Sequence, residues 1–213
     1  MNASVAKKID EILKLDEMAD TTSKAELADH TIAFEHVTFS YGEEQPVLKD
    51  VSFTVPDGKV TALAGVSGSG KSTAASLIPR FYDVQSGSVA IGGVDVRDIE
   101  KQELMKRVAF VFQNTCLFKD TLLNNIKAAR PDAGSEEVLR AVDDAQCRDI
   151  IDRLPNGLDT LVGTGGTYLS GGENQRIALA RAILKDAPII VLDEATAFAD
   201  AENEHQIQLA FER

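Results

Sequence analysis

The stretch GVSGSGKS, residues 65–72, decides the fold of this 213-residue chain. It follows the apolar run VTALAG, residues 60–65, which we expect to be a strand, and it precedes a predicted helix that ends near Pro79. A glycine-rich turn that joins a strand to a helix is typical of α/β proteins. The rest of the chain should therefore alternate strands with helices.

Hydrophobic periodicity extends this pattern in both directions. From Thr31, IAFEHVTFSY and VLKDVSFTV alternate apolar and polar residues, which predicts a small antiparallel sheet. Further on, RVAFVFQ and PIIVLDE are expected to be buried strands, whereas residues 120–154 and SGGENQRIALARAIL are expected to be helices. Alternating strands and helices predict a parallel sheet that is covered on both faces.

Composition excludes several classes of protein. The net charge of -12 argues against a nucleic-acid platform, which would carry a basic face. No run approaches the roughly 18 apolar residues of a membrane-spanning helix, and MNASVAKKID has no apolar signal core. Cys116 and Cys147 have no Cys or His neighbour at metal-ligand spacing, so both are expected to be reduced and free of zinc.

The glycine-rich stretch fits the phosphate-binding pattern G-x-x-x-x-G-K-[ST]. Its glycines let successive backbone amides point at phosphate oxygens, Lys71 would reach the β- and γ-phosphates, and Ser72 would ligate Mg²⁺. The alternative is a glycine-rich turn with a chance lysine. The residues expected to contact the nucleotide are Gly65, Val66, Ser67, Gly68, Ser69, Gly70, Lys71, Ser72 and Thr73.

A pair of carboxylates ends the second buried strand, at Asp193 and Glu194. Ligands of a P-loop sheet bind at the carboxyl ends of its strands, so Asp193 is expected to hold Mg²⁺, through water. Glu194 would act as a general base on the attacking water and is a candidate catalytic residue together with Lys71. The alternative is a strand end that faces solvent.

The stretch LSGGENQR, residues 169–176, distinguishes among P-loop families. Ser170 and Glu173 have the spacing of a capping box, so a well-capped helix start is one interpretation. A capping box does not explain the two glycines, which permit close approach of an anion to the helix end. Here the chain resembles the ATP-binding cassette family, whose signature is LSGGQ; Glu173 replaces the usual glutamine, which is a mild change.

This resemblance implies that two cassettes pair head to tail. The signature of one would close on the γ-phosphate held by the other, so that Ser170, Gly171 and Gly172 act across the interface. The expected partners are therefore a second cassette, identical or different, and a transmembrane domain of the same parent chain. The expected cofactors are ATP and Mg²⁺.

Three further residues match the motifs of the family. Tyr41 corresponds to the aromatic residue that stacks on adenine, although taken alone it would be a strand aromatic in a small core. Gln113, at the end of RVAFVFQ, corresponds to the catalytic glutamine that contacts Mg²⁺ and the attacking water. Asp200 corresponds to the aspartate of the loop that crosses the dimer interface.

The resemblance also implies a subtype and a division of the chain. Residues 4–15 carry a one-sided apolar stripe, so residues 1–30 are expected to be a linker helix and connector from a transmembrane domain. Residues 31–213 would form the cassette, with a helical signature subdomain over about 114–175 inserted in a P-loop α/β core. The segment TLVGTGGTYLSGG resembles exporter-type cassettes, with the usual glutamate replaced near Thr164.

Two departures from the family stand near the C-terminus. The loop after the acidic pair reads Ala197-Phe198-Ala199-Asp200, a variant that resembles transporters associated with iron-siderophore uptake. The family histidine that contacts the γ-phosphate is expected beyond Arg213, and His205 is expected to be a solvated surface residue. We therefore expect residues 1–213 to bind ATP-Mg²⁺ but to hydrolyse it slowly or not at all.

The function that the resemblance implies is that of an ATPase subunit that powers transport, at the cytoplasmic face of a membrane. Siderophore or iron transport and drug or lipid transport are both open. One alternative is a soluble cassette ATPase that acts on nucleic acid or ribosomes, but the chain lacks the coiled-coil and basic insertions of those relatives. Another alternative is a nucleotide-binding module without catalysis.

Overall fold

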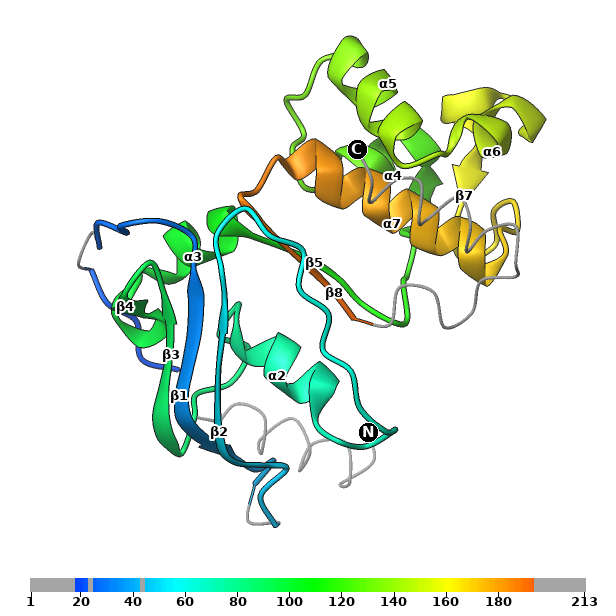
Figure 1. Cartoon of the computed structure of the whole chain (residues 1–213). Coiled ribbons are helices and arrows are strands. Elements are labelled where there is room, and N and C mark those ends of the chain that lie inside the picture. The colour runs from blue at the N-terminus through cyan, green and yellow to red at the C-terminus, as the bar shows by residue number, and fades with distance from the viewer. Residues whose placement is uncertain (1–17, 23–24, 43–44, 194–213) are drawn as a thin grey trace, which may run out of the picture.

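The computed structural model of the chain describes residues 18–22, 25–42 and 45–193 (Figure 1). Several predictions from the sequence lie outside these residues: the helix near 4–15, the candidate base Glu194, the loop that contains Asp200, and the last helix with His205. Within the described part, no helix is long and apolar enough to cross a membrane.

The predicted antiparallel sheet is confirmed. Its strands are β1 (Ile32–Phe39), β2 (Leu48–Val55), β3 (Ser86–Ile91) and β4 (Val94–Asp95), in the spatial order β2-β1-β3-β4. Alternation of apolar and polar residues along β1 buries one face of the strand, where Phe34 stacks on a β2 phenylalanine at 4.4 Å between ring centroids. This face and α2 (Lys71–Leu77) share one hydrophobic core.

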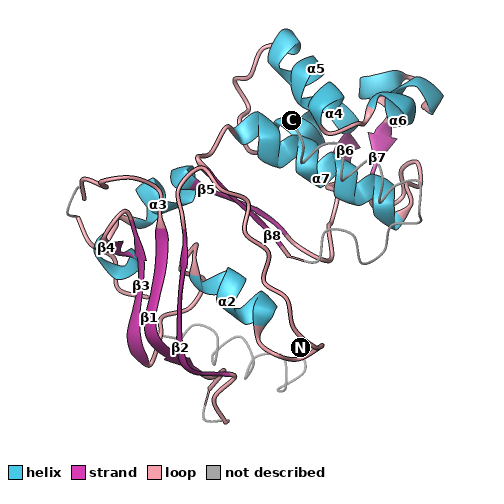
Figure 2. Ribbon diagram, in the orientation of Figure 1, coloured by secondary structure: helices cyan, strands magenta, loops and turns pink. Residues whose placement is uncertain are grey.

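The predicted strands on either side of the helical region are also confirmed, as a parallel pair. β5 (Val108–Val111) pairs with β8 (Ile189–Leu192), with Val108 opposite Ile189. Figure 2 shows this pair between the antiparallel sheet and the helical part of the molecule. Since the strands run in the same direction, the residues that follow them emerge at one edge.

The strand predicted for VTALAG, residues 60–65, is wrong. The described structure has no strand there: the segment is an extended loop from β2 to α2 (Lys71–Leu77), and Val60 is 93% exposed. A strand is stabilised by its backbone ladder, and no described strand pairs with this segment. The helix expected after the glycine-rich turn is confirmed.

The helices predicted over residues 120–154 are confirmed, and they pack with α7 (Gly171–Lys185) around a second hydrophobic core. Figure 1 places this helical part at the opposite end of the molecule from the antiparallel sheet. Two-residue strands β6 and β7 pair within it. The remaining elements are η1 (Val96–Asp98), α3 (Lys101–Arg107), β6 (Asp120–Thr121), α4 (Leu122–Lys127), α5 (Ser135–Asp144), α6 (Arg148–Arg153), η2 (Gly157–Asp159) and β7 (Leu161–Val162).

The longest described helix, α7 (Gly171–Lys185), joins the two parts. Its Ile177 and Leu179 lie in the helical core, whereas Ala178 and Ala182 pack against β5. Small alanines permit this close packing of helix on strand. The start of α7 is therefore held in the helical part, and its end leads through a short turn into β8.

Candidate functional site

The glycine-rich turn and the acidic end of β8 meet in space. Ser72, in the first turn of α2, donates a hydrogen bond from Oγ to Asp193 Oδ1 at 2.6 Å, and 121 residues separate the two. The backbone amide of Asp193 also donates to the Val111 carbonyl at the end of β5, at 3.0 Å. The β5–β8 edge and the start of α2 thus form one site.

The backbone of the glycine-rich turn requires glycine at Gly70, the last glycine of the stretch. Gly70 has φ +90°, and a Cβ placed on it would lie 2.7 Å from Leu48 Cδ2. Gly68 also has positive φ, at +77°. Such angles are strained for residues with a side chain, so glycine is the residue that makes this turn without strain at these two positions.

Lys71 folds back over the turn. Its Nζ donates to the carbonyl oxygens of Gly65 and Val66, at 3.0 Å each. Ser67 and Ser69, which lie in the chain between Val66 and Gly70, are exposed. The ammonium group therefore lies over the loop that the motif assigns to phosphate binding, and its present partners are neutral carbonyls.

Tyr41 lies beside the start of α2. Its hydroxyl donates to Thr73 Oγ1 at 3.1 Å, and its ring makes edge contacts with Phe39 and Tyr82. The side chain remains partly open, since Tyr41 is 41% exposed. Sequence reasoning missed Tyr82, which follows α2 in the stretch PRFYDV and offered only its aromatic character as a signal.

Gln113 lies just after β5, close to the end of β8. Its backbone carbonyl accepts a long hydrogen bond of 3.5 Å from Gln175 Nε2 of α7. Gln113 is only half-buried. Gln113 and Asp193 thus follow the paired ends of β5 and β8, and Ser72 of α2 contacts Asp193.

The signature segment begins α7 with the predicted capping box. The Glu173 amide donates to Ser170 Oγ at 3.3 Å, and Ser170 N donates to Glu173 Oε2 at 2.7 Å. The other carboxylate oxygen of Glu173 pairs with Arg153 of α6, a residue that sequence reasoning missed. Burial acts to raise the pKa of Glu173, but the Ser170 and Arg153 contacts outweigh it, and the pKa lies below its ordinary value.

The signature and the glycine-rich turn are not brought together within one chain. Figure 1 shows the start of α7 far from the start of α2, on the side of the helical part that lies away from the β-sheet. Ser170, Gly171 and Gly172, at the start of α7, are therefore not part of the site that Ser72 and Asp193 form within one chain. Glu194 and Asp200 lie outside the described residues.

The donor atoms at the β8 edge suit Mg²⁺. The hydroxyl of Ser72 and the carboxylate of Asp193 are oxygen ligands, which this hard cation prefers, and their 2.6 Å contact shows that both reach one point. Anionic phosphates would find the Lys71 ammonium and the exposed turn next to it. The residues present therefore fit a nucleotide with its magnesium ion.

The fold and this edge define a P-loop α/β domain, and comparison with known proteins specifies the family. The family model described as "ABC transporter" matches residues 48–197. The chain belongs to the ABC transporter family.

Named relatives and a solved structure agree with this assignment. Mycobactin import ATP-binding/permease protein IrtA of Mycobacterium tuberculosis is 50% identical over 186 residues, which are 87% of this chain and 22% of the relative. The ATP-dependent lipid A-core flippase of Vibrio cholerae is 48% identical over 191 residues, 89% of this chain and 33% of the relative. The chain thus spans a third or less of these relatives. A bacterial Atm1-family ABC exporter with ATP bound superposes with a TM-score of 0.88 at 37% identity, over 98% of this chain and 37% of that chain.

Proposed function

We propose that this chain supplies the ATP-binding site of a transporter ATPase, that hydrolysis takes place in the full-length parent protein, and that a transmembrane domain of that parent moves the cargo. The observation that carries the proposal is the hydrogen bond from Ser72 to Asp193, which joins the phosphate-binding turn to the acidic strand end. A turn with a chance lysine would not need a carboxylate at that point. Membership of the ABC transporter family supports the same function.

The residues of the site divide the chemistry among them. Lys71 exchanges the carbonyls of Gly65 and Val66 for β- and γ-phosphate oxygens, a stronger charge-assisted contact. Ser72 and Asp193 hold the magnesium ion, with Gln113 beside them. Bound there, Mg²⁺ supplies positive charge that stabilises the phosphates during transfer.

Hydrolysis requires a base next to the phosphate. Glu194, the residue after Asp193, accepts a proton from water as the water oxygen bonds to the γ-phosphorus and the bond to the ADP oxygen breaks. Gln113 orients that water. Tyr41, partly exposed beside Thr73, stacks on the adenine ring.

A second cassette completes the site. The distance between the start of α7 and the start of α2 within one chain supports a head-to-tail dimer, in which Ser170, Gly171 and Gly172 reach the γ-phosphate of the partner. Asp200 contacts the partner at the same interface. The pair works at the cytoplasmic face of the membrane.

The cargo that we propose is of the siderophore or lipid class. The named relatives support this choice, since one imports mycobactin and the other is a lipid A-core flippase. The sequence Ala197-Phe198-Ala199-Asp200 favours the siderophore class between the two.

Nucleotide binding tests the core of the proposal. We expect the full chain to bind a fluorescent ATP analogue with Mg²⁺, and Lys71→Ala to weaken binding at least about tenfold, because a charged phosphate contact is lost. Lys59→Ala is the matched control, since Lys59 is an exposed lysine near the same loop. Equal affinity of the Lys71 and Lys59 variants would refute the assignment of the turn.

A further inference from the structure

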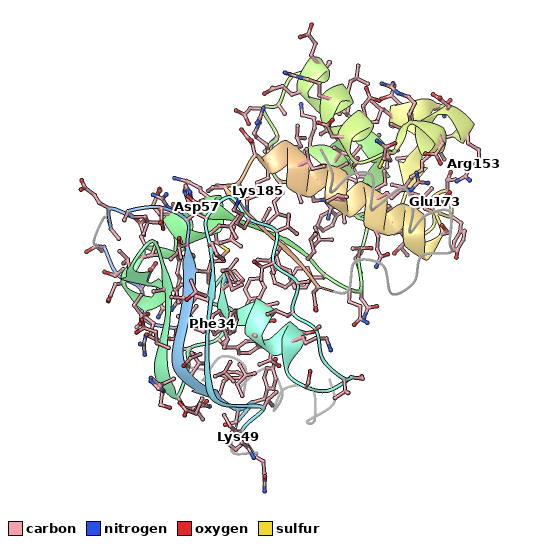
Figure 3. The ribbon with its side chains drawn as sticks, viewed as in Figure 1. Phe34, Lys49, Asp57, Arg153, Glu173 and Lys185 are labelled. Atoms are coloured by element: carbon pink, nitrogen blue, oxygen red, sulfur yellow. The ribbon has the colours of Figure 1, made fainter. Side chains whose placement is uncertain are left out.

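Glu173 places a negative charge at the start of the signature helix. Its side chain is 9% exposed, Oε2 accepts from Ser170 N at 2.7 Å, and Oε1 is paired with Arg153 at the end of α6. Figure 3 shows the Arg153 and Glu173 side chains at neighbouring positions, one from α6 and one from the start of α7. The family signature usually has a neutral glutamine at this position, so the negative charge is a departure of this chain from that signature.

This charge conflicts with the use proposed for the same helix end. A helix N-terminus attracts an anion through its free amides and its dipole, and a carboxylate in the first turn satisfies part of that attraction. An unpaired Glu173 would also repel the γ-phosphate by direct charge interaction at short range. The Arg153 side chain is 61% exposed, so its charge lies at the protein surface beside the start of α7.

We propose that Arg153 neutralises Glu173 and so allows the start of α7 to receive the γ-phosphate of ATP held by a second copy of the cassette. This inference rests on the proposed function. Arg153 is then a positioning residue of the composite ATP site: it acts through Glu173 and Ser170 and does not contact the nucleotide. A second consequence concerns ATP-dependent dimerisation. Glu173 should weaken dimerisation when Arg153 is absent, whereas a neutral residue at position 173 should make Arg153 unnecessary for it.

The chain contains a matched arrangement where no phosphate is expected. At the start of α5, Glu137 Oε2 accepts from Gly134 N at 2.8 Å, and Arg130 pairs with the other oxygen. Arg130 and Arg153 therefore make the same kind of contact with the third residue of a helix. If an arginine–glutamate pair only stabilises the helix start, loss of either arginine should have the same effect. If the pair acts on ATP-dependent dimerisation, only loss of Arg153 should weaken dimerisation.

ATP-dependent dimerisation distinguishes these effects. The full chain with Glu194→Gln, which removes the proposed base, is followed by sedimentation at increasing ATP-Mg²⁺. This parent is compared with the same chain that also carries Arg153→Gln, Arg153→Lys, Glu173→Gln, Arg153→Gln/Glu173→Gln or Arg130→Gln. We expect Arg153→Gln to weaken dimerisation about tenfold, less at high salt because the repulsion is screened. Arg153→Lys, Glu173→Gln, the double variant and Arg130→Gln should stay within about twofold of the parent.

The double variant is the decisive measurement. If Arg153→Gln weakens dimerisation and Glu173→Gln does not restore it, or if Arg130→Gln weakens it equally, charge compensation at the signature is wrong. Thermal unfolding of each variant reports any common loss of stability, and Arg153→Lys keeps the charge if the neutral variant unfolds. A parent that neither binds ATP nor dimerises would overturn the proposed function itself; a parent that does both, with Arg153→Gln unaffected, would overturn only this inference.

Discussion

Ser72 and Asp193 are the two residues on which the proposed chemistry depends most. The Ser72 hydroxyl donates to the Asp193 carboxylate at 2.6 Å, so the charge of Asp193 already lies over the first turn of α2. Asp193→Asn keeps the size of the side chain and removes its charge. The variant therefore isolates the contribution of that charge to magnesium binding.

Mg²⁺ should increase the ATP affinity of the parent chain. We expect Asp193→Asn to reduce this increase at least about tenfold, since a carboxylate ligand is replaced by a neutral amide. ATP titrations with and without Mg²⁺ measure this increase directly. Asp186→Asn is the control, because Asp186 is exposed and its left-handed backbone, φ +56°, also suits asparagine. A Mg²⁺ effect that survives in Asp193→Asn would exclude the assigned ligand.

The two cysteines differ in solvent exposure, and thiol labelling can measure this difference. Cys116 is exposed, whereas Cys147 is buried in the helical core, and burial raises the pKa of its thiol to about 12. The thiolate is the reactive form, so the native protein at pH 8 should react with a thiol reagent at Cys116 only. Denaturant should expose the second thiol. Rapid native labelling of both, with Cys116→Ser as control, would contradict the described burial.

At the scale of elements, Asn125 connects α4 to the segment that follows Gln113. Asn125 is fully buried, and it accepts from Phe118 N at 2.8 Å and donates to the carbonyls of Phe118 and Thr121 at 3.0 Å each. Arg181 of α7 donates to the Asn125 backbone carbonyl at 2.9 Å and, more weakly, to the Asn125 side-chain Oδ1 at 3.4 Å. One side chain therefore holds a loop, a helix start and the signature helix together.

Asn125→Ala should lower the free energy of unfolding by about 3 kcal/mol, because it leaves three backbone groups without their partner and opens a cavity. Urea unfolding followed by circular dichroism measures the change. Asn124→Ala is matched in sequence but removes only an exposed contact with Asp120, and it should cost less than about 0.5 kcal/mol. Similar losses in both variants would show that the buried network does not hold α4.

Sequence reasoning was most reliable for elements whose signal is local. The capping box of Ser170 and Glu173 marks the start of α7, and β5 and β8 lie within the apolar runs that predict them. The strand predicted over 60–65 failed because a short apolar run does not by itself make a strand, which exists only where another strand pairs with it. Arg153 was missed because its partner lies 20 residues away, on another element.

At the scale of the whole molecule, arginine-paired carboxylates link stability to pH. For Asp95, Asp149 and Glu173, burial acts to raise the pKa, but contacts with Arg97, Arg176 and Arg153 respectively outweigh it, and each pKa lies below its ordinary value of 3.8 or 4.5. Below the ordinary pKa, the unfolded chain then binds more protons than the folded one. Their contribution to stability is thus fully present above about pH 4.5 and is lost as the pH falls through the lowered values.

We expect the free energy of unfolding to decrease from pH 5 toward pH 3, as measured by urea titration at each pH. Asp149→Asn should cost about 1.5 kcal/mol at pH 7, because buried Arg176 loses its charged partner, and should reduce the acid-dependent loss. Asp152→Asn, at an exposed position on the same helix, is the control and should leave both unchanged. Equal stability at pH 5 and pH 3 would contradict the described pairs.

The sequence by itself determined the features that depend on neighbouring residues: the glycine-rich turn with Lys71 and Ser72, the capped start of α7, and the periodicity that separates sheet from helix. These follow from backbone angles and side-chain spacing within a few residues. Only the tertiary structure decided that Ser72 meets Asp193, that Arg153 pairs with Glu173, and that residues 60–65 form no strand. Each of these depends on packing between distant segments, because a contact forms only where the surrounding core brings both partners to the same place.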